Sequence, residues 1–238
     1  MTNNLANAST VGYKKEGSTS QSFDDVLTVK IKDQSVGMRN AQKIGIKNPG
    51  VKIGENYTDY SQGSFRITGN TYDLALSGEG FFAIEFTNKA GETDTKYTRA
   101  GQFTLNKDGY LVTEEGDYVL DTQNRRIRLN TLIDSSIADD GTIYQNGQAM
   151  AKIQVTDFAD YDYLEKYGET YYQPIQGAQT IASNAQVKSG YLEMANVQIV
   201  SEMVNLISIT RAYESNQKVV QTIDDTLDVA VNQIGRVQ

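Results

Sequence analysis

Residues 102–121 read QFTLNKDGYLVTEEGDYVLD, and this stretch decides the fold class of the chain. It contains three short runs rich in β-branched and aromatic residues, QFTLN (102–106), YLVT (110–113) and DYVLD (117–121). Asp108-Gly109 and Glu115-Gly116 separate these runs, and glycine supplies the positive φ that tight hairpin turns require. The pattern therefore predicts antiparallel strands joined by short turns.

The same pattern extends through residues 61–180. Further strand-like runs are FFAIEF (81–86), KYTRA (96–100), RIRL (126–129), GTIYQN (141–146) and KIQVTDF (152–158). Asp140-Gly141 and Asn146-Gly147 add two more turn signals. Strands every 8–12 residues predict an antiparallel sandwich or an irregular barrel, and the sequence leaves the choice between them open.

Residues 1–60 are polar and rich in Asn, Lys and Gly, with weak periodicity. The segments 12–15 (GYKK) and 45–50 (GIKNPG) indicate loop or extended strand. Residues 23–31 (FDDVLTVKI) fit a short strand and a turn of helix equally well.

The C-terminal region has a helical pattern, because neither glycine nor proline occurs between Gly190 and Gly235. Its apolar stripe consists of Val197, Val200, Val204 and Ile207, followed by Val220, Ile223, Leu227, Ala230 and Ile234. The two halves are offset, which indicates a stutter near 211–215. A helix of about 40 residues is ~60 Å long, more than a β domain of this size covers. The stripe therefore predicts another helix beside it.

Taken together, the patterns predict a mostly β chain with a long C-terminal α-helix. The expected architecture is an irregular antiparallel β domain plus a helical, coiled-coil-like layer. The predicted domains are an N-terminal connector (1–60), a β domain (61–185) and a C-terminal helical assembly segment (186–238). The chain offers no second long amphipathic segment, so the partner helix is expected from another subunit or from upstream of Met1.

The composition excludes several classes of chemistry. The 238 residues include no Cys, His or Trp, so thiol nucleophiles, Ser-His-Asp triads, zinc fingers and haem ligation are excluded. The net charge is −8, with +2 in residues 1–60 and −5 in each of 61–150 and 151–238. An acidic chain without a basic stripe argues against nucleic acid as a partner. No apolar run is long enough to span a membrane, and the N-terminus has no secretory signal pattern.

Several motifs resemble those of the bacterial flagellar rod and hook proteins. The opening 2–14 (TNNLANASTVGYK) resembles an NNLAN segment followed by Gly-Tyr-Lys. The central stretch of that family is matched by segments at 62–64, 68–70, 73–75, 78–82, 97–103 and 109–112. Its helical end is matched by 190–193 (GYLE), 196–197, 202–204 (EMV) and 211–214 (RAYE). Within the family the chain looks most like the distal rod proteins, and next like the proximal rod paralogues.

The resemblance implies a structural subunit that polymerises helically into the shaft between flagellar motor and hook and transmits torque. The implied partners are further copies of the chain, neighbouring rod and hook proteins, and the flagellar export apparatus. The implied location is the basal body outside the cytoplasmic membrane, in the periplasm or cell-wall zone, reached without a cleaved signal peptide. No enzymatic activity, cofactor or metal is expected.

Family members carry an N-terminal helix that begins before the NNLAN segment, whereas the printed sequence starts at its edge. Either the sequence is trimmed, its start is misassigned, or this member lacks the helix. In the first two cases the upstream helix is the expected partner of the stripe at 197–234.

The resemblance and the stripe together define two candidate sites. The expected assembly interface is Val197, Val200, Val204, Ile207, Val220, Ile223, Leu227 and Ile234, with Glu202, Arg211 and Glu214 as register-setting charges between neighbours. The expected connector, which seats the helix layer on the β layer, is Asn3, Asn4, Leu5, Asn7, Gly12 and Tyr13. Asn side chains can satisfy backbone groups where a chain turns, although an Asn-rich turn without special role is the alternative.

Other motifs have plainer interpretations. Gly78-Glu79-Gly80 precedes a strand and not a helix, so a tight turn is favoured over a phosphate loop. An acid–base pair for glycan hydrolysis is one interpretation of the turn carboxylates Glu114, Glu115, Asp117, Asp121, Asp139 and Asp140, but solvated loops fit them better. A Ca²⁺-binding loop is one interpretation of residues 157–162, but a solvated loop fits this segment better as well. The tyrosines of 157–173 fit either core or subunit contacts. The alternative function is a secreted β-domain protein that binds or cleaves cell-wall glycan.

Overall fold

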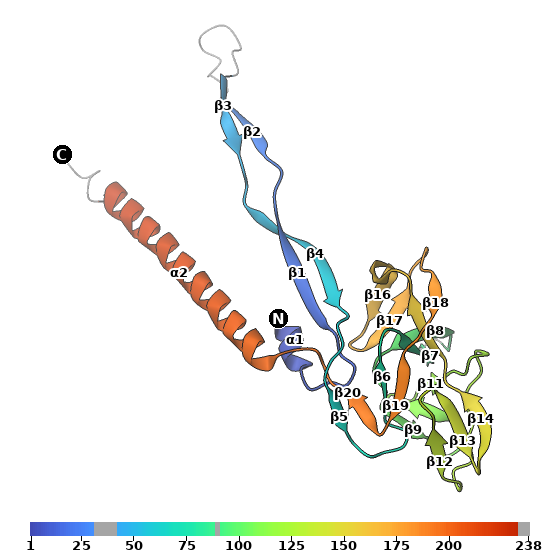
Figure 1. The fold of residues 1–238 in the computed structure, drawn as a ribbon. Helices are drawn as coiled ribbons and strands as arrows, with labels where there is room; N and C mark the ends of the chain where they lie inside the picture. Colours follow the sequence, from blue (N-terminus) through green and yellow to red (C-terminus); the bar gives the residue numbers. More distant parts are fainter. Residues whose placement is uncertain (31–41, 89–90, 233–238) are drawn as a thin grey trace, which may run out of the picture. The chain divides into compact units, whose positions relative to one another are not determined.

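The computed structural model describes residues 1–30, 42–88 and 91–232, whose fold is drawn in Figure 1. The chain divides into two compact units. Residues 1–15 and 60–238 form the larger unit, and residues 16–59 form the smaller one. The smaller unit is therefore an excursion of the chain between two parts of the larger unit.

The smaller unit consists of paired strands. β1 (Lys15–Ser22) pairs with β4 (Val51–Asp59), and β2 (Val26–Lys30) pairs antiparallel with β3 (Gln42–Lys47). A Cβ at Gly17 would lie 2.4 Å from Cζ of Tyr57, so a larger residue there would displace the exposed Tyr57 ring. The open choice for residues 23–31 is resolved as a strand for Val26–Lys30, and residue 31 lies outside the described residues.

The larger unit is built around a nine-stranded sheet in the described residues, with the order β16-β17-β8-β7-β11-β10-β9 and with β15 joining β7 to β18. Smaller sheets are β12-β13-β14, β19-β6 and β20-β5. The strands are β5 (Phe65–Ile67), β6 (Leu74–Ser77), β7 (Phe81–Thr87), β8 (Thr93–Thr98), β9 (Phe103–Leu105), β10 (Leu111–Thr113), β11 (Tyr118–Val119), β12 (Ser135–Ile137), β13 (Thr142–Gln145), β14 (Gln148–Lys152), β15 (Val155–Phe158), β16 (Leu164–Tyr167), β17 (Tyr171–Pro174), β18 (Thr180–Ala182), β19 (Gln186–Ser189) and β20 (Tyr191–Glu193).

Two apolar clusters form the core. Phe82 belongs to the first cluster, with Leu74, Phe103 and Ile143 among others, and Phe81 belongs to the second, with Tyr172 among others. Successive side chains of a strand point to opposite faces of its sheet. Phe81 and Phe82 of β7 therefore lie on opposite faces of the main sheet, and both faces are covered.

The predicted antiparallel β domain is confirmed. The runs at 81–86, 96–100, 102–106, 110–113, 117–121, 141–146 and 152–158 all contain strand residues. β9 pairs with β10 and β10 with β11, both antiparallel, as the opening stretch predicts. The turn residues Gly109, Gly116, Gly141 and Gly147 all have positive φ.

The run at 126–129 is a correction, because it forms no strand. Its backbone makes only isolated bridges, Leu120 with Arg126 and Tyr110 with Arg128. The Asp121 carboxylate accepts hydrogen bonds from the backbone N–H groups of Gln123 and Arg125, which bend the chain into a turn just before this run. The β-branched pattern is present, but the turn interrupts a continuous ladder.

The C-terminal helix α2 spans Ile199–Asn232. The structure places two strands, β19 and β20, inside the segment 186–238 that the sequence assigns to the helical layer. The reason is pairing: β19 pairs with β6 and β20 with β5, both antiparallel. Val197 lies before the helix, and Ile234 lies outside the described residues. α2 continues through 211–215, so the predicted offset between the two halves of the stripe falls within one continuous helix.

A short helix α1 (Thr2–Ala6) begins the chain, where the sequence indicates only a polar turn. It packs against the first turns of α2, and its Asn4 side chain donates a hydrogen bond to the Glu202 carboxylate. A 3₁₀ turn, η1, covers Tyr161–Tyr163. The N-terminal segment of the larger unit thus contacts the start of its last helix.

The close approach of Gly101 to Leu74 generates a stability prediction. A Cβ at Gly101 would lie 1.7 Å from the carbonyl oxygen of Leu74, and the two backbones are hydrogen-bonded there. Gly101→Ala must push backbone apart in the core, so we expect a loss of about 3 kcal/mol in the free energy of unfolding. Urea unfolding of the soluble protein measures this loss.

Gly116→Ala is the control for this prediction, because Gly116 has φ of +98° and open space around its missing Cβ. We expect about 1–2 kcal/mol there, from backbone strain alone. Equal losses in the two variants would contradict the steric argument.

Candidate functional site

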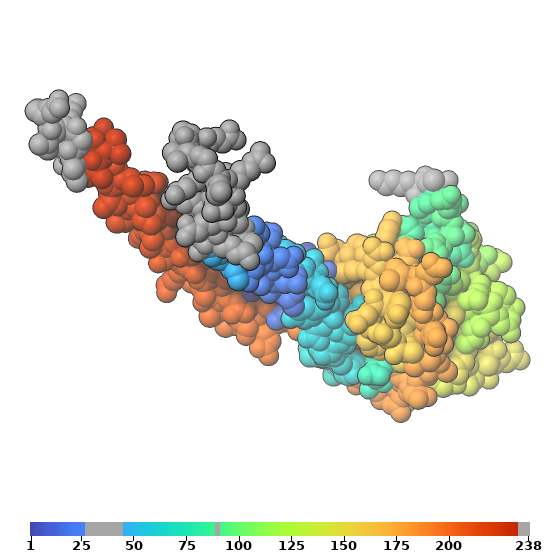
Figure 2. All heavy atoms as spheres, turned by 90° about the horizontal axis from the view of Figure 1, so that it is seen from above, coloured from blue at the N-terminus to red at the C-terminus, as the bar shows by residue number. Residues whose placement is uncertain are grey.

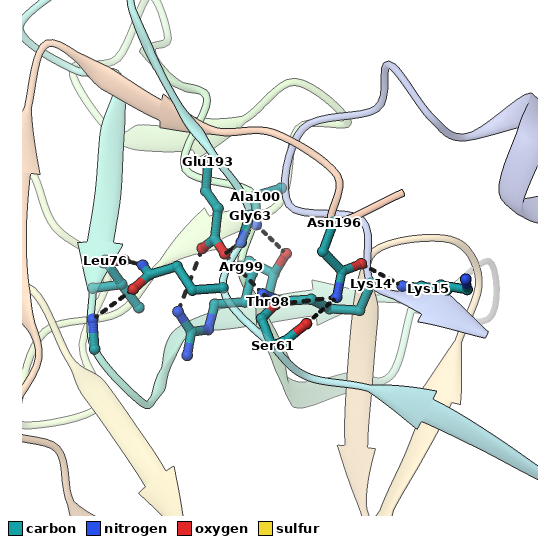
Figure 3. A network of polar contacts seen from close by, with 12 residues as sticks. Lys14, Lys15, Ser61, Gly63, Leu76, Thr98, Arg99, Ala100, Glu193 and Asn196 are labelled. Atoms are coloured by element: carbon teal, nitrogen blue, oxygen red, sulfur yellow. Dashed lines mark hydrogen bonds and ion pairs between the residues drawn. The ribbon is translucent and has the colours of Figure 1, made fainter. Parts of the chain in front are cut away.

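A polar junction joins three segments of the larger unit (Figure 3). These are the N-terminal stretch through Lys15, the stretch at 61–63 and the stretch that leads from β20 into α2, and a fourth segment, just after β8, contributes Arg99. The junction is formed by Asn4, Tyr13, Lys14, Lys15, Ser61, Gly63, Arg99, Glu193, Asn196 and Glu202.

Glu193 is the centre of the junction and is fully buried. One carboxylate oxygen accepts hydrogen bonds from Lys14 Nζ at 2.7 Å and from the backbone N–H of Gly63 at 2.9 Å. The other oxygen lies 3.4 Å from a guanidinium nitrogen of Arg99. A buried charge is tolerated only when it is paired and hydrogen-bonded, and Glu193 meets this condition through donors from three segments.

Lys14 and Arg99 are also buried and each has a second contact. Lys14 Nζ donates to the carbonyl oxygen of Ser61 at 2.7 Å. The Arg99 guanidinium lies over the Phe81 ring, 5.3 Å from its centroid, which favours a cation in a poorly hydrated site. The junction is therefore linked to the second core cluster through Phe81.

A second carboxylate, Glu202, lies in the first turns of α2 and is also buried. It accepts a hydrogen bond from Lys15 Nζ at 2.7 Å and one from Asn4 Nδ2 at 3.4 Å. Tyr13 donates its hydroxyl hydrogen to Asn4 Oδ1 at 3.0 Å. The bond from Lys15 lowers the pKa of Glu202 below its ordinary value, against the opposing effect of burial, with further help from Asn4 and the N-terminal amine.

The backbone between these charges is fixed by close packing. Gly12 has φ of +69°, and a Cβ there would lie 2.2 Å from the backbone nitrogen of Ala100. Its N–H donates to the carbonyl oxygen of Glu193 at 2.8 Å. Asn196 Oδ1 accepts from the Lys15 N–H at 2.7 Å, and its Nδ2 donates to Ser61.

The structure brings together part of the connector predicted from sequence. Asn4, Gly12 and Tyr13 lie in or beside the junction and are buried. Leu5 and Asn7 are not among its residues. Asn7 instead donates to Asn3 and, at 2.8 Å, to the Glu169 carboxylate on the surface.

The charged members of the junction were missed by sequence reasoning. Lys14, Lys15, Arg99 and Glu193, together with the uncharged Asn196, all occur inside or next to quoted motifs, but an apolar-pattern argument gives a charged or polar residue no reason to be buried. Glu202 is a correction: it is bound to Lys15 and Asn4 within the chain and is not an exposed register charge.

The predicted interface residues of α2 are exposed (Figure 2, orange to red). Six of them, Val200, Val204, Ile207, Val220, Ile223 and Leu227, have relative exposures between 48% and 75%. Half-exposed aliphatic side chains are unusual at this density on one helix. Burial of the remaining exposed surface of each side chain would stabilise a contact by about 1 kcal/mol. Val197 is half-buried in the segment before the helix.

Because α2 is continuous, the two halves of the predicted stripe lie on different faces of the helix. At 3.6 residues per turn, Val204 and Leu227 point about 140° apart around the helix axis. The first-half face consists of Val200, Val204 and Ile207, and the second-half face consists of Val220, Ile223 and Leu227. The offset seen in the sequence is therefore a change of face along a straight helix.

The turn carboxylates serve local structure. Asp140 accepts hydrogen bonds from the N–H and the hydroxyl of Thr142, and these bonds lower the pKa of Asp140. The Asp121 carboxylate accepts hydrogen bonds from Nε and from one terminal guanidinium nitrogen of Arg125. Among the described residues no group of three or more acidic side chains is placed to hold a metal ion. Gly78 and Gly80 both have positive φ and lead directly into β7, as a tight turn requires.

The tyrosines of 157–173 divide between core and surface. Tyr171 and Tyr172 are buried, whereas Tyr163 and Tyr167 are more than 40% exposed. Burial is the main cause of the raised pKa of Tyr171, whose hydroxyl hydrogen-bonds with Thr113 and Asp117. Neither helix in the described ranges combines the length and apolar character that a membrane crossing demands.

Neutralising Glu193 tests the junction. Glu193→Gln leaves the buried Lys14 without its counter-charge, so we expect the free energy of unfolding to fall by about 3–5 kcal/mol. Chemical denaturation of the purified protein measures this change in the free energy of unfolding. Glu85→Gln is the matched control, because Glu85 binds the partly exposed Arg126 and its loss should cost less than about 1 kcal/mol. Similar losses of unfolding free energy in the two variants would contradict a larger contribution of the Glu193 ion pair to stability.

The lowered pKa of Glu202 predicts a pH dependence. A carboxylate with a folded-state pKa below its unfolded value contributes stability above the unfolded pKa, and this contribution is lost as pH falls through the folded pKa. The ordinary value is 4.5, so the loss begins near that pH and grows below it. We expect Glu202→Gln to flatten the fall in unfolding free energy between about pH 5 and pH 3. An unchanged slope would contradict the assignment.

Comparisons with known proteins place this geometry in a family. Residues 75–145 match the model described as flagellar hook protein FlgE/F/G D1 domain, and residues 188–234 match that described as flagellar basal body rod FlgEFG protein C-terminal. The chain is 34% identical to the flagellar basal-body rod protein FlgG of Bacillus subtilis, over 97% of this chain and 90% of that one.

Two further relatives agree with this placement. The chain is 32% identical to the basal-body rod protein FlgG of Agrobacterium fabrum, over 95% of this chain and 89% of that one. It is 31% identical to the basal-body rod protein FlgF of Caulobacter vibrioides, over 99% and 90%. The chain therefore belongs to the flagellar basal-body rod protein family.

Proposed function

We propose that this chain is a non-enzymatic structural subunit of the flagellar basal-body rod and that it polymerises helically through α2. The carrying observation is the row of exposed apolar side chains on α2, in a chain whose relatives are named basal-body rod proteins. The rod is the shaft through which torque passes from motor to hook. A subunit of such a shaft needs extensive contacts and no chemistry, which suits a chain without Cys or His.

The two faces of α2 support an open polymer. A subunit in a helical filament makes heterologous contacts, in which two different surface patches meet and the arrangement does not close. A helix with one apolar face can satisfy one neighbour. α2 offers a second face, about 140° away, and so can contact different neighbouring helices along its two halves.

The charges of α2 add selectivity to these contacts. Arg211 and Glu214 are exposed near the middle of the helix, and Asp224, Asp225 and Asp228 give its last part a negative charge. Exposed pairs contribute only about 0.2–1 kcal/mol each, but opposed signs penalise a wrong register. These residues are proposed to select the register of neighbours that the apolar faces bind.

The proposed partners and location follow from the family. Neighbouring rod and hook proteins continue the shaft at its ends. The subunit is exported through the flagellar apparatus without a cleaved signal peptide and is assembled outside the cytoplasmic membrane, in the periplasm or cell-wall zone. Among the described residues no observation favours the alternative function, binding or cleavage of cell-wall glycan.

Charge substitution in the apolar faces tests the function. We expect Val204→Asp and Leu227→Asp each to abolish polymerisation, because a carboxylate in a helix–helix contact leaves a buried charge unpaired. Each variant removes one face, so each alone should be sufficient. Sedimentation and electron microscopy of the purified proteins measure assembly, and circular dichroism checks that the β domain remains folded.

Gln217→Glu and Gln221→Glu are the matched controls, because they add the same charge with little change of shape and point about 60° or more away from the residues of the second-half face beside which they lie. We expect both controls to polymerise as the unsubstituted protein does. Normal polymers and normal motility with both Val204→Asp and Leu227→Asp would refute α2 as the interface.

A further inference from the structure

Lys15 makes two contacts that lead to α2. Its backbone N–H donates to Asn196 Oδ1 at 2.7 Å, in the segment that precedes the helix. Its ammonium group binds the Glu202 carboxylate at 2.7 Å, in the first turns of the helix. Asn196 in turn donates to the carbonyl and hydroxyl oxygens of Ser61, at 3.1 and 3.0 Å. Lys15 thus holds the approach to α2 through Asn196, a contact drawn in Figure 3, and the beginning of the helix through Glu202.

Glu202 is the buried residue of α2 within Ile199–Asn232. From Ile207 to the end of the described helix every residue is exposed. The placement of the helix therefore depends on contacts near its start. Two side-chain donors reach the Glu202 carboxylate, and the charged Lys15 donor, at 2.7 Å, is closer than Asn4 at 3.4 Å. Charge-assisted hydrogen bonds of this length are the stronger kind.

We propose that Lys15 is the positioning residue of the assembly helix: its ion pair with Glu202 and its bond to Asn196 fix the direction in which α2 leaves the β domain. The inference rests on the proposed function, because a fixed direction matters only if α2 binds neighbouring subunits. The role proposed for Lys15 is indirect. It acts through Glu202, by orienting both apolar faces of the helix before a neighbour binds.

The length of α2 makes a small change at Lys15 large at the far end. Thirty residues follow Glu202 in the described helix, which is about 45 Å at 1.5 Å per residue. A rotation of about 10° at the first turns displaces the last turn by about 8 Å over that length. Without Lys15, Glu202 is a buried carboxylate with one weak donor. The first turns then shift to let water reach the charge.

The absence of cysteine allows a direct measurement. Leu132→Cys lies on an exposed turn of the β domain, and Ser215→Cys is a near-isosteric change on an exposed position of α2. Nitroxide labels are attached at both sites, one on the β domain and one on the helix. Pulsed electron–electron double resonance then measures the distribution of distances between the two labels. We expect one narrow distribution in the otherwise unsubstituted protein.

Three variants in this labelled background separate positioning from general stability. Lys15→Met keeps the aliphatic stem and removes the charge, and we expect the distribution to broaden at least twofold. Lys15→Arg retains a cation that can bind Glu202, and we expect it to restore the narrow distribution. Lys107→Met, at an exposed lysine in the turn after β9, is the matched control and should leave the distribution narrow.

The urea midpoint and helical circular dichroism of each variant show that it is folded. If Lys15→Met does not fold, Glu202→Gln removes the same charge pair from the other side and should broaden the distribution as well. A distribution that is already broad with Lys15 present would overturn the proposal, and so would an unchanged distribution in the folded Lys15 variant.

Assembly of the Val204→Asp protein distinguishes this inference from the proposed function. If that variant polymerises normally while Lys15→Met broadens the distribution, the helix is positioned by Lys15 but is not the assembly surface. If Val204→Asp blocks assembly while Lys15→Met leaves the distribution narrow, the assembly role stands and the positioning inference fails.

Discussion

The buried pairing of Glu193 with Lys14 is the interaction on which the arrangement of the larger unit depends. A carboxylate with no exposure must keep its donors, and here the donors come from the N-terminal segment, from Gly63 and from Arg99 after β8. Apolar packing alone gives cohesion without much direction. The ion pair adds direction, because its hydrogen bonds allow one relative placement of the three segments. Such a pair contributes mainly specificity, and its disruption costs more than its formation contributes.

The helix that follows this pair shows the opposite character. Its apolar side chains are left exposed, and within the described residues they have no partner helix along most of its length. A protein that keeps its polar groups inside and part of its apolar surface outside is suited to assembly with other chains. The two faces along α2 are the patches through which we propose that each subunit meets different neighbours in an open polymer.

Sequence reasoning predicted the parts of this fold that repeat and missed those that occur once. The strands of 102–121 were predictable, because alternation and turn glycines act locally. The exposed stripe of α2 was predictable from its spacing. The run at 126–129 was wrong, because the turn held by Asp121 depends on side-chain geometry that β propensity does not register. The junction could not be predicted, since its partners are more than a hundred residues apart, as in Lys14 and Glu193.

The position of Asn196 has a consequence for how such chains vary. Its amide holds Lys15, where the chain departs for the smaller unit, and Ser61, where the chain returns. The ends of the excursion 16–59 are thus fastened by a residue that lies outside it. Length changes inside an excursion with fixed ends add little closure entropy, growing only with the logarithm of the length. We therefore expect related chains to tolerate changes of length and sequence in the smaller unit while the proposed assembly helix keeps its anchor.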